Sequence, residues 1–194
     1  MALLLDCAAV VGRQRAALCT PQLHLPRQAA AFLVGAAQLA AILDAARTGF
    51  DAVVIDTGPL FDAAMLAALD HSQQLLLVCN PEVTSLKNVR IGLETIDRLG
   101  FPREKVSLVA NRIGAAGAVA PDDIEDALDT KIAFALPDDP AVPAAINRAL
   151  PVVLADEGSD FAQAAARLAA AVFAGSRAAA DGASRRRFGL RGRR

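Results

Sequence analysis

Short apolar runs alternate with longer helical patterns along this chain. Each run has the length of a strand that is buried on both faces of a sheet. Strands that alternate with helices indicate βαβ units, a parallel sheet and right-handed crossovers. The expected strands are 52–55, 74–79, 105–110 and 132–136.

The helix expected over 84–99 has the clearest pattern. Its apolar residues fall on one face of a 3.6-residue period, and Gly100 follows as a C-cap. These apolar residues are Leu86, Val89, Leu93 and Ile96. Further helices are expected over 27–47, from 121 onward, over 140–150 and over 159–174, the last with Ser159 as its N-cap.

These patterns predict an α/β fold with a parallel sheet and helices on both faces, within residues 1–174. The apolar residues 1–5 are expected to add a short buried strand. From Gly175 onward the chain is rich in Ala, Gly, Ser and Arg, which do not bury a core. Residues 175–194 are therefore expected to be a disordered, arginine-rich tail.

Composition limits the class of protein. The 194 residues are 54% hydrophobic, which suffices for one domain with a core. No apolar run reaches the roughly 18 residues of a membrane-spanning helix, and the N-terminal run is too short for a secretion signal. Cys7, Cys19 and Cys79 have neither disulfide nor zinc spacing. A cytoplasmic protein is expected, with peripheral attachment at the inner membrane as the alternative.

Charge is unevenly distributed. The chain carries a net charge of −1, but residues 177–194 contain seven arginines and one aspartate, for +6, which leaves −7 on the other 176 residues. A basic end of this kind attracts nucleic acid or anionic lipid, or it keeps the protein soluble. The sequence leaves these alternatives open.

The first expected strand ends in an acidic residue, Asp56. Open α/β sheets bind ligands at the carboxyl edge of their strands, where a carboxylate can hold a hydrated magnesium ion. A simple strand cap is the alternative. Val54, Leu76 and Leu108 are expected in adjacent strands, and this brings Asp56, Asn80 and Asn111 together at the carboxyl edge.

Four segments carry a resemblance to a known family. They are Asp56-Thr-Gly-Pro59, Leu77-Val-Cys-Asn80-Pro-Glu82-Val-Thr-Ser85-Leu-Lys87-Asn88, Val109-Ala-Asn111-Arg112 and Ala135-Leu-Pro137-Asp-Asp-Pro140-Ala-Val142. In this order and spacing they resemble the Walker B, Asn-Pro-Glu, Asn-Arg and Pro-x-Asp segments of the MinD/ParA-type (deviant Walker) P-loop ATPases. The resemblance spans about residues 18–174.

The resemblance implies ATP and magnesium as cofactors and a three-layer P-loop NTPase fold. It implies that Asp56 orients the magnesium shell indirectly, that Asn111 and the Pro137 region flank the adenine, and that Pro59 and Arg112 belong to the same nucleotide site. It also implies a dimer face near residues 82–88, although MinD has an acidic residue where this chain has Asn88. No catalytic residue is assigned.

One family feature is missing from this sequence. The family binds phosphates with a Gly-rich loop that contains two lysines and opens a helix. The chain has only Lys87, Lys105 and Lys131, and none lies in such a loop. The domain is therefore expected to be N-terminally incomplete, either as a truncated reading frame or as a degenerate paralogue. ATP binding is expected to be weak or absent.

Within the family, the CpaE/TadZ branch of Flp (Tad) pilus assembly is the most similar. The segments Leu18-Cys-Thr-Pro21 and Asn147-Arg-Ala-Leu-Pro151 and the arginine-rich end resemble that branch. The resemblance implies a homo- or heterodimer with an ATPase-family partner and contact with the pilus or secretion machinery. The alternatives are a truncated ParA/MinD-type partitioning or positioning ATPase and a non-catalytic dimerisation partner of an intact ATPase.

Overall fold

A computed structural model of the chain describes residues 16–18, 35–50, 52–57 and 61–188. The expected strand at residues 1–5 therefore lies outside the described residues, as do Cys7, Cys19 and most of the first half of the expected helix 27–47. None of the helices in the described ranges is both long enough and apolar enough to cross a membrane.

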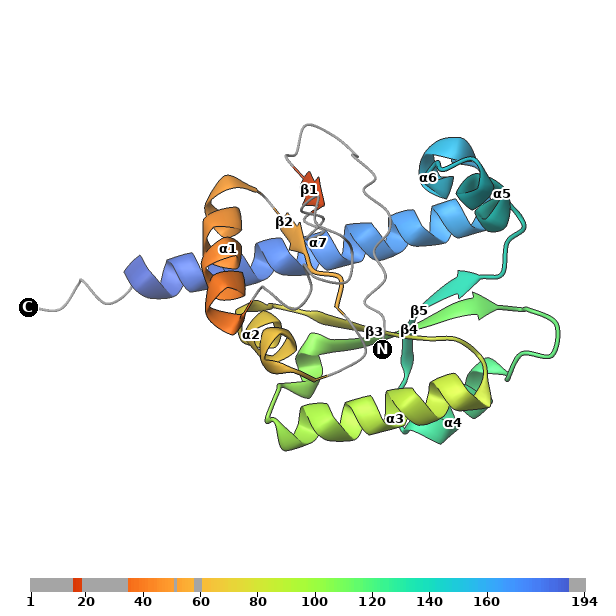
Figure 1. The fold of residues 1–194 in the computed structure, drawn as a ribbon, viewed down its shortest axis with the longest axis horizontal. Coiled ribbons are helices and arrows are strands. Elements are labelled where there is room, and N and C mark those ends of the chain that lie inside the picture. The colour runs from red at the N-terminus through yellow and green to blue at the C-terminus, as the bar shows by residue number, and fades with distance from the viewer. Residues whose placement is uncertain (1–15, 19–34, 51, 58–60, 189–194) are drawn as a thin grey trace, which may run out of the picture.

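A parallel three-stranded sheet forms the centre of the molecule (Figure 1). Its order is β3 (Leu75–Cys79), β4 (Val106–Ile113) and β5 (Ile132–Pro137). In β3, four of the five side chains are at most 5% exposed, as expected for a strand covered on both faces. The expected α/β fold with helices on both faces of a parallel sheet is confirmed.

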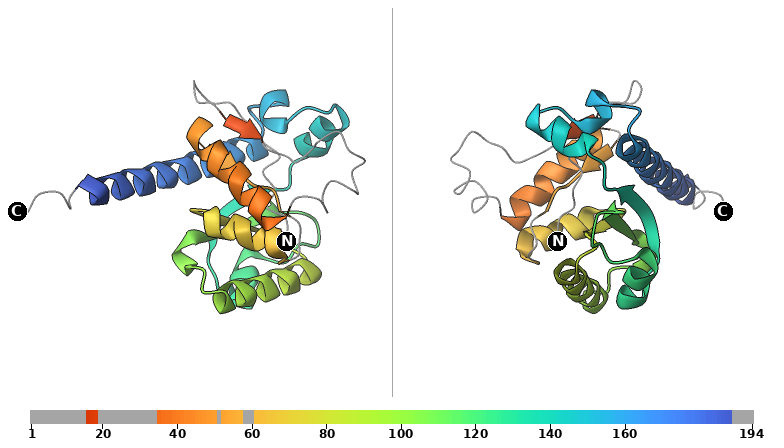
Figure 2. Two further views of the ribbon diagram at one scale, coloured as in Figure 1. Left: turned by 60° about the vertical axis from the view of Figure 1, so that its left-hand side comes forward. Right: turned by 90° about the vertical axis from the view of Figure 1, so that its right-hand side faces the viewer.

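Alternate residues of the strands pack against different helices. Leu77 and Cys79 point into a cluster with the buried face of α3 (Val83–Arg98) and with α4 (Pro121–Leu128). Leu76 packs on the opposite face against α7 (Asp160–Phe188). Figures 1 and 2 show the sheet between these two layers. Burial raises the pKa of the Cys79 thiol to about 11, as for a small buried core side chain.

The N-terminal part differs from the expectation. The short strand β2 (Ala52–Val54) pairs in parallel with β1 (Ala16–Leu18) in a separate two-stranded sheet. Within the described residues β2 is not hydrogen-bonded to β3, so the expected adjacency holds for β3 and β4 but is wrong for β2 and β3. Helix α1 (Ala36–Gly49) precedes β2.

Helix α2 (Ala63–His71) was not expected from the sequence pattern. Its N-terminus is capped by Asp62, whose carboxylate accepts a hydrogen bond of 2.8 Å from the backbone N–H of Met65. A buried face formed by Met65, Ala68 and Leu69 holds it against the body, and the cluster includes Leu75 and Ile96. The capping residue and this apolar face explain why the segment is helical.

The C-terminal elements are the 3₁₀ turn η1 (Arg103–Lys105) before β4, then α5 (Ala141–Asn147), α6 (Val152–Ala155) and α7. The expected caps are confirmed: Gly100 adopts φ +70° after α3, and the Ser159 hydroxyl accepts a 3.1 Å hydrogen bond from the N–H of Ala162.

Helix α7 continues to Phe188, past the helix end expected at Ala174. The expected disorder of residues 175–194 stays a prediction. Alanine and arginine are strong helix formers, and a helix already nucleated on the core extends at little cost. Residues 189–194 lie outside the described part of the chain.

Asp139 joins three elements where β5 ends. Its carboxylate accepts 2.8 Å and 3.0 Å hydrogen bonds from the backbone N–H groups of Ala141 in α5 and Phe161 in α7. The bond from Phe161, followed by the one from Ala141, lowers the pKa of Asp139 from its ordinary value of 3.8. The carboxylate thus stabilises the fold in its charged form.

The pKa of Asp139 is lower in the folded state than in the unfolded chain. The carboxylate therefore contributes its full stabilisation of the fold when the pH is above the pKa of the unfolded chain, and this stabilisation is lost as the pH falls through the pKa of the folded state. We expect Asp139→Asn to lower the free energy of unfolding near neutral pH, and this deficit to shrink below about pH 4. Urea unfolding across that range measures it. Asp70→Asn, an exposed position, is the matched control. A deficit independent of pH contradicts the account.

Candidate functional site

The carboxyl ends of β3 and β4 bring two asparagines together. Asn80 directly follows β3, and Asn111 lies near the end of β4. The side-chain amide of Asn111 donates a 3.1 Å hydrogen bond to the Oδ1 of Asn80. The Ser85 hydroxyl accepts a 3.0 Å bond from the Asn80 N–H and so holds this turn against the start of α3. Their expected proximity is confirmed.

Arg112 occupies an unusual backbone position. Its φ of +55° lies in the left-handed region, which non-glycine residues rarely adopt outside functional sites and turns. The register between β4 and β5 shifts here, because Ala110 pairs with Ala135 while Ile113 pairs with Pro137. Bulges of this kind are frequent beside active sites, since they redirect a side chain.

The side chain of Arg112 is directed at Asp138, the residue after β5. Its Nε donates a 2.9 Å hydrogen bond to the Asp138 carboxylate, and this bond raises the pKa of the guanidinium. The two side chains are 54% and 40% exposed, so the pair contributes little to stability and remains accessible to a ligand. Sequence reasoning missed Asp138, although its position at a strand end was the available signal.

Pro137, the last residue of β5, stands at the same edge. It is in register with Ile113, and the next N–H, of Asp138, donates a 2.9 Å bond to the Ile113 carbonyl. The structure therefore brings together three predicted site residues, Asn111, Arg112 and Pro137.

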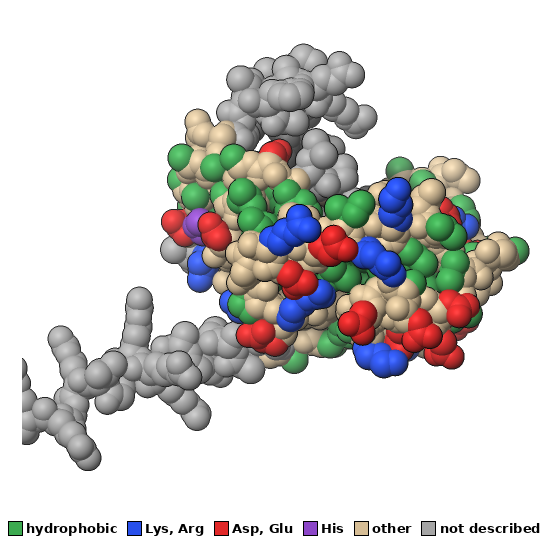
Figure 3. Space-filling model, turned by 90° about the horizontal axis from the view of Figure 1, so that it is seen from below, with side chains coloured by type: hydrophobic (Ala, Val, Ile, Leu, Met, Phe, Trp, Pro, Cys, Tyr) green, Lys and Arg blue, Asp and Glu red, His purple; other side chains and the backbone are tan. Residues whose placement is uncertain are grey.

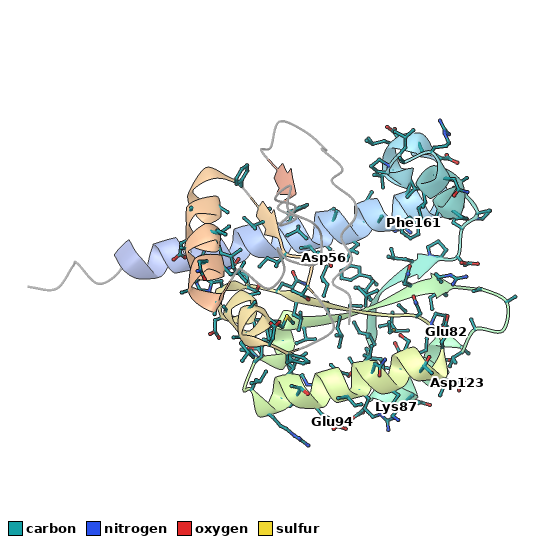
Figure 4. The ribbon with its side chains drawn as sticks, viewed as in Figure 1. Asp56, Glu82, Lys87, Glu94, Asp123 and Phe161 are labelled. Carbon is teal, nitrogen blue, oxygen red and sulfur yellow. The ribbon has the colours of Figure 1, made fainter. Side chains whose placement is uncertain are left out.

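A small hollow borders this edge. It is lined by Pro81, Glu82, Arg112 and residues 115–118. The Val119 N–H donates a 3.0 Å hydrogen bond to the Pro81 carbonyl, which fixes the loop after β4 against the start of α3. Figure 4 shows Glu82 at this end of α3.

Asp56 is not brought to the asparagine pair. It is exposed and follows β2, whose pairing with β1 places it in the other sheet. Figure 4 shows Asp56 well separated from Glu82. For Asp56 the shared edge stays a prediction, because β2 does not pair with β3 among the described residues. Pro59 lies outside the described residues.

The hydroxyl of Thr57, beside Asp56, is buried and has no hydrogen-bond partner among the described residues, which do not include 58–60. Sequence reasoning missed this residue, and no pattern signals it. A buried hydroxyl costs free energy when it has no partner. Asp56 and Thr57 together offer one carboxylate and one hydroxyl.

At the carboxyl edge, Asn111 offers a side-chain amide and Pro137 an apolar ring. The described part of the chain provides no lysine near Asp56: Lys87 is exposed on α3, Lys105 lies over the Phe101 ring, and Lys131 pairs with Glu125. Within that part, no three acidic, His or Cys side chains group as a metal site.

Similar proteins were found among curated sequences. A putative septum site-determining protein MinD of Emiliania huxleyi is 26% identical over 127 residues, which cover 63% of this chain and 46% of that protein. The septum site-determining protein MinD of Thermotoga maritima is 24% identical over 110 residues, 54% and 41% of the two chains. This chain thus spans less than half the length of these relatives. No family model matches it.

Solved structures share the fold. A ParA family ATPase from Chlorobium tepidum has a TM-score of 0.65 at 18% identity, covering 70% of this chain and 57% of that one. MinD complexed with Mg-ADP from Pyrococcus horikoshii has a TM-score of 0.59 at 20% identity, covering 70% and 55%. The MinC:MinD cell division protein complex of Aquifex aeolicus has 0.58 at 21%, covering 68% and 56%. The fold expected from the four segments is confirmed.

Proposed function

We propose that this chain is a MinD/ParA-type ATPase-family protein of the CpaE/TadZ branch, which acts in pilus assembly by localisation and interaction, with ATP turnover lost or impaired. The observation that carries the proposal is the Asn80–Asn111 pair at the carboxyl edge of β3 and β4. It joins two of the four segments on which the family resemblance rests. The curated MinD relatives support the coarser part of the proposal.

The asparagine pair has the chemistry to recognise a base. An Asn side chain has two donors and an acceptor oxygen. One N–H of the Asn111 amide donates its hydrogen bond to Asn80. The remaining N–H and the oxygen match the adjacent acceptor and donor on the edge of adenine, as Asn does when it reads that base. Asn80 thus serves to orient Asn111.

Phosphate recognition is the weak part of the site. In the family, ATP with magnesium supplies the charge that the phosphate loop and its lysines bind. This sequence holds no Gly-rich loop with lysine, and the charge of Arg112 is partly neutralised by Asp138. Without preorganised donors for the β- and γ-phosphates, the transition state of phosphoryl transfer is not stabilised. The proposal therefore assigns interaction, rather than turnover, to this chain.

A dimer with an intact ATPase-family partner suits the face at the start of α3. Val83, beside Glu82, exposes 76% of its surface. The resemblance implies a dimer contact at residues 82–88. An exposed valine there supplies apolar area for such a contact.

This interface can be tested with the chain and a full-length CpaE/TadZ-type ATPase. We expect a heterodimer in analytical ultracentrifugation, stronger with ATP, and at least tenfold weaker for Val83→Asp, because a charge is buried without a partner. Ile146→Asp, at a position 68% exposed on α5, is the matched control and should bind normally. No complex, or equal losses for both variants, would remove the proposed interaction.

A second candidate is a ParA/MinD-type partitioning or positioning protein. The curated relatives favour it, because their names assign septum site determination to them. Gene neighbours separate the two candidates. A secretion ATPase and a pilin beside this gene support pilus assembly, while partition or division genes support positioning.

A further inference from the structure

Strand β5 forms one edge of the central sheet. Among the residues that the structure describes, β5 pairs with β4 along one side and with no strand along its other side, which we call the open edge. The right-hand view of Figure 2 shows β5 as the outermost strand of this sheet. An open edge presents backbone N–H and C=O groups to which a further strand can hydrogen-bond.

The sequence of β5 carries no charge along the strand itself. Edge strands are commonly protected from further pairing by charged side chains or by proline within the strand. Residues 132–136 contain neither, and Pro137 is only the last residue of β5. The lower face of the molecule, where α3 and α4 lie, differs, because Figure 3 shows charged side chains of both signs spread over it.

A bulge limits the part of β5 that can accept a further strand. The pairing with β4 skips Ala133, because Ile132 and Phe134 pair with consecutive residues of β4. A bulge bends an edge strand and disfavours pairing at that point. The accessible part therefore begins at Phe134. From there, Phe134 and Leu136 pack on the α7 side of the sheet, while Ala135 is exposed.

We propose that the open edge of β5 pairs with β5 of a second copy of this chain, antiparallel and centred on Ala135. A two-fold axis then sets Ala135 opposite its own copy and Phe134 opposite Leu136 of the second copy. The small alanine side chains let the two backbones approach, and the apolar cross-strand pairs stabilise the contact.

Charges at the two ends of β5 favour a second copy as the occupant. Lys131 precedes the strand, and 88% of its side chain is exposed although it pairs with Glu125. Asp138 follows the strand, and 40% of its side chain is exposed beside Arg112. Antiparallel pairing of two copies brings the Lys131 end of one strand to the Asp138 end of the other, whereas parallel pairing would bring like charges together. The same chain thus supplies the complementary charges.

The contact is tested by sedimentation velocity of the full chain, without nucleotide, over a dilution series. We expect a dimer that dissociates on dilution. Ala135→Glu and Ala135→Lys place like charges opposite each other at the two-fold axis, so each should weaken dimerisation at least about tenfold. An equal mixture of the two variants should restore it to within about threefold of the unchanged chain, because Glu and Lys then face each other.

Ala41→Glu and Ala41→Lys, at an exposed position on α1, are the matched controls and should dimerise like the unchanged chain. Val83→Asp should do so as well, which separates this contact from the heterodimer proposed above. A chain that stays monomeric overturns the proposal. Equal losses in the Ala41 variants, or a mixture of the Ala135 variants that dimerises no better than its components, also overturn it.

Discussion

Replacement of Leu77 with alanine is expected to lower the free energy of unfolding by about 3 kcal/mol. Leu77 is the central residue of β3 and is fully buried. It packs in a cluster with Leu86, Val89 and Leu93 of α3. Truncation removes transfer free energy and leaves a cavity between the sheet and the helix, which close packing prevents from collapsing fully.

Leu154→Ala is the matched control, because Leu154 is 60% exposed on α6. The same atoms are removed there without a cavity, so a change below about 0.5 kcal/mol is expected. Urea unfolding followed by circular dichroism measures both. Similar losses for the two variants would contradict the assignment of β3 and α3 to the core.

The strands of the central sheet could be predicted because consecutive apolar residues are sufficient to define them. β3, β4 and β5 were each located from the sequence. The end of β4 was placed three residues early, at Ala110, because Asn111 and Arg112 are polar. They remain in the strand because backbone pairing with β5 continues to Ile113. The local pattern of hydropathy does not predict backbone hydrogen bonds between strands that are far apart in the sequence.

Pairing partners were harder to predict than strands. β2 was recognised as a strand, but its alignment with β1 rather than β3 depends on contacts between segments far apart in the chain. Helix α2 was missed because its alanine-rich sequence has apolar residues on most faces, which weakens the 3.6-residue signal.

The part of the site that lies at the carboxyl ends of the strands could be predicted from the sequence. The carboxyl-edge rule brought Asn80 and Asn111 together, and the structure joins them by a hydrogen bond. The ion pair of Arg112 with Asp138 depends on a left-handed residue and a register shift, which only coordinates show. The burial of the Thr57 hydroxyl is likewise a property of packing.

The central proposal is that the edge at Asn80 and Asn111 binds a base and that the residues of this sequence bind phosphate weakly or not at all. An ordinary P-loop ATPase gains most of its nucleotide affinity from the phosphates and therefore binds ATP far more tightly than adenosine. For this chain, whose sequence holds no Gly-rich loop with lysine, we expect the two affinities to differ by less than about threefold. This loss of the phosphate contribution to ATP affinity is the second large effect that we predict, after the loss of stability in Leu77→Ala.

Asn111 provides the internal check. Asn111→Ala removes the one or two hydrogen bonds that we propose for the base, so adenosine affinity should fall about fivefold to tenfold. Asn88→Ala, an exposed position on α3, is the matched control and should leave the affinity unchanged.

The most direct measurement is isothermal titration of the full chain with ATP and magnesium, beside adenosine. The account predicts weak binding of both, with dissociation constants within about threefold of each other and no effect of magnesium. A micromolar dissociation constant for ATP that requires magnesium, together with adenosine binding at least about a hundredfold weaker, would contradict it.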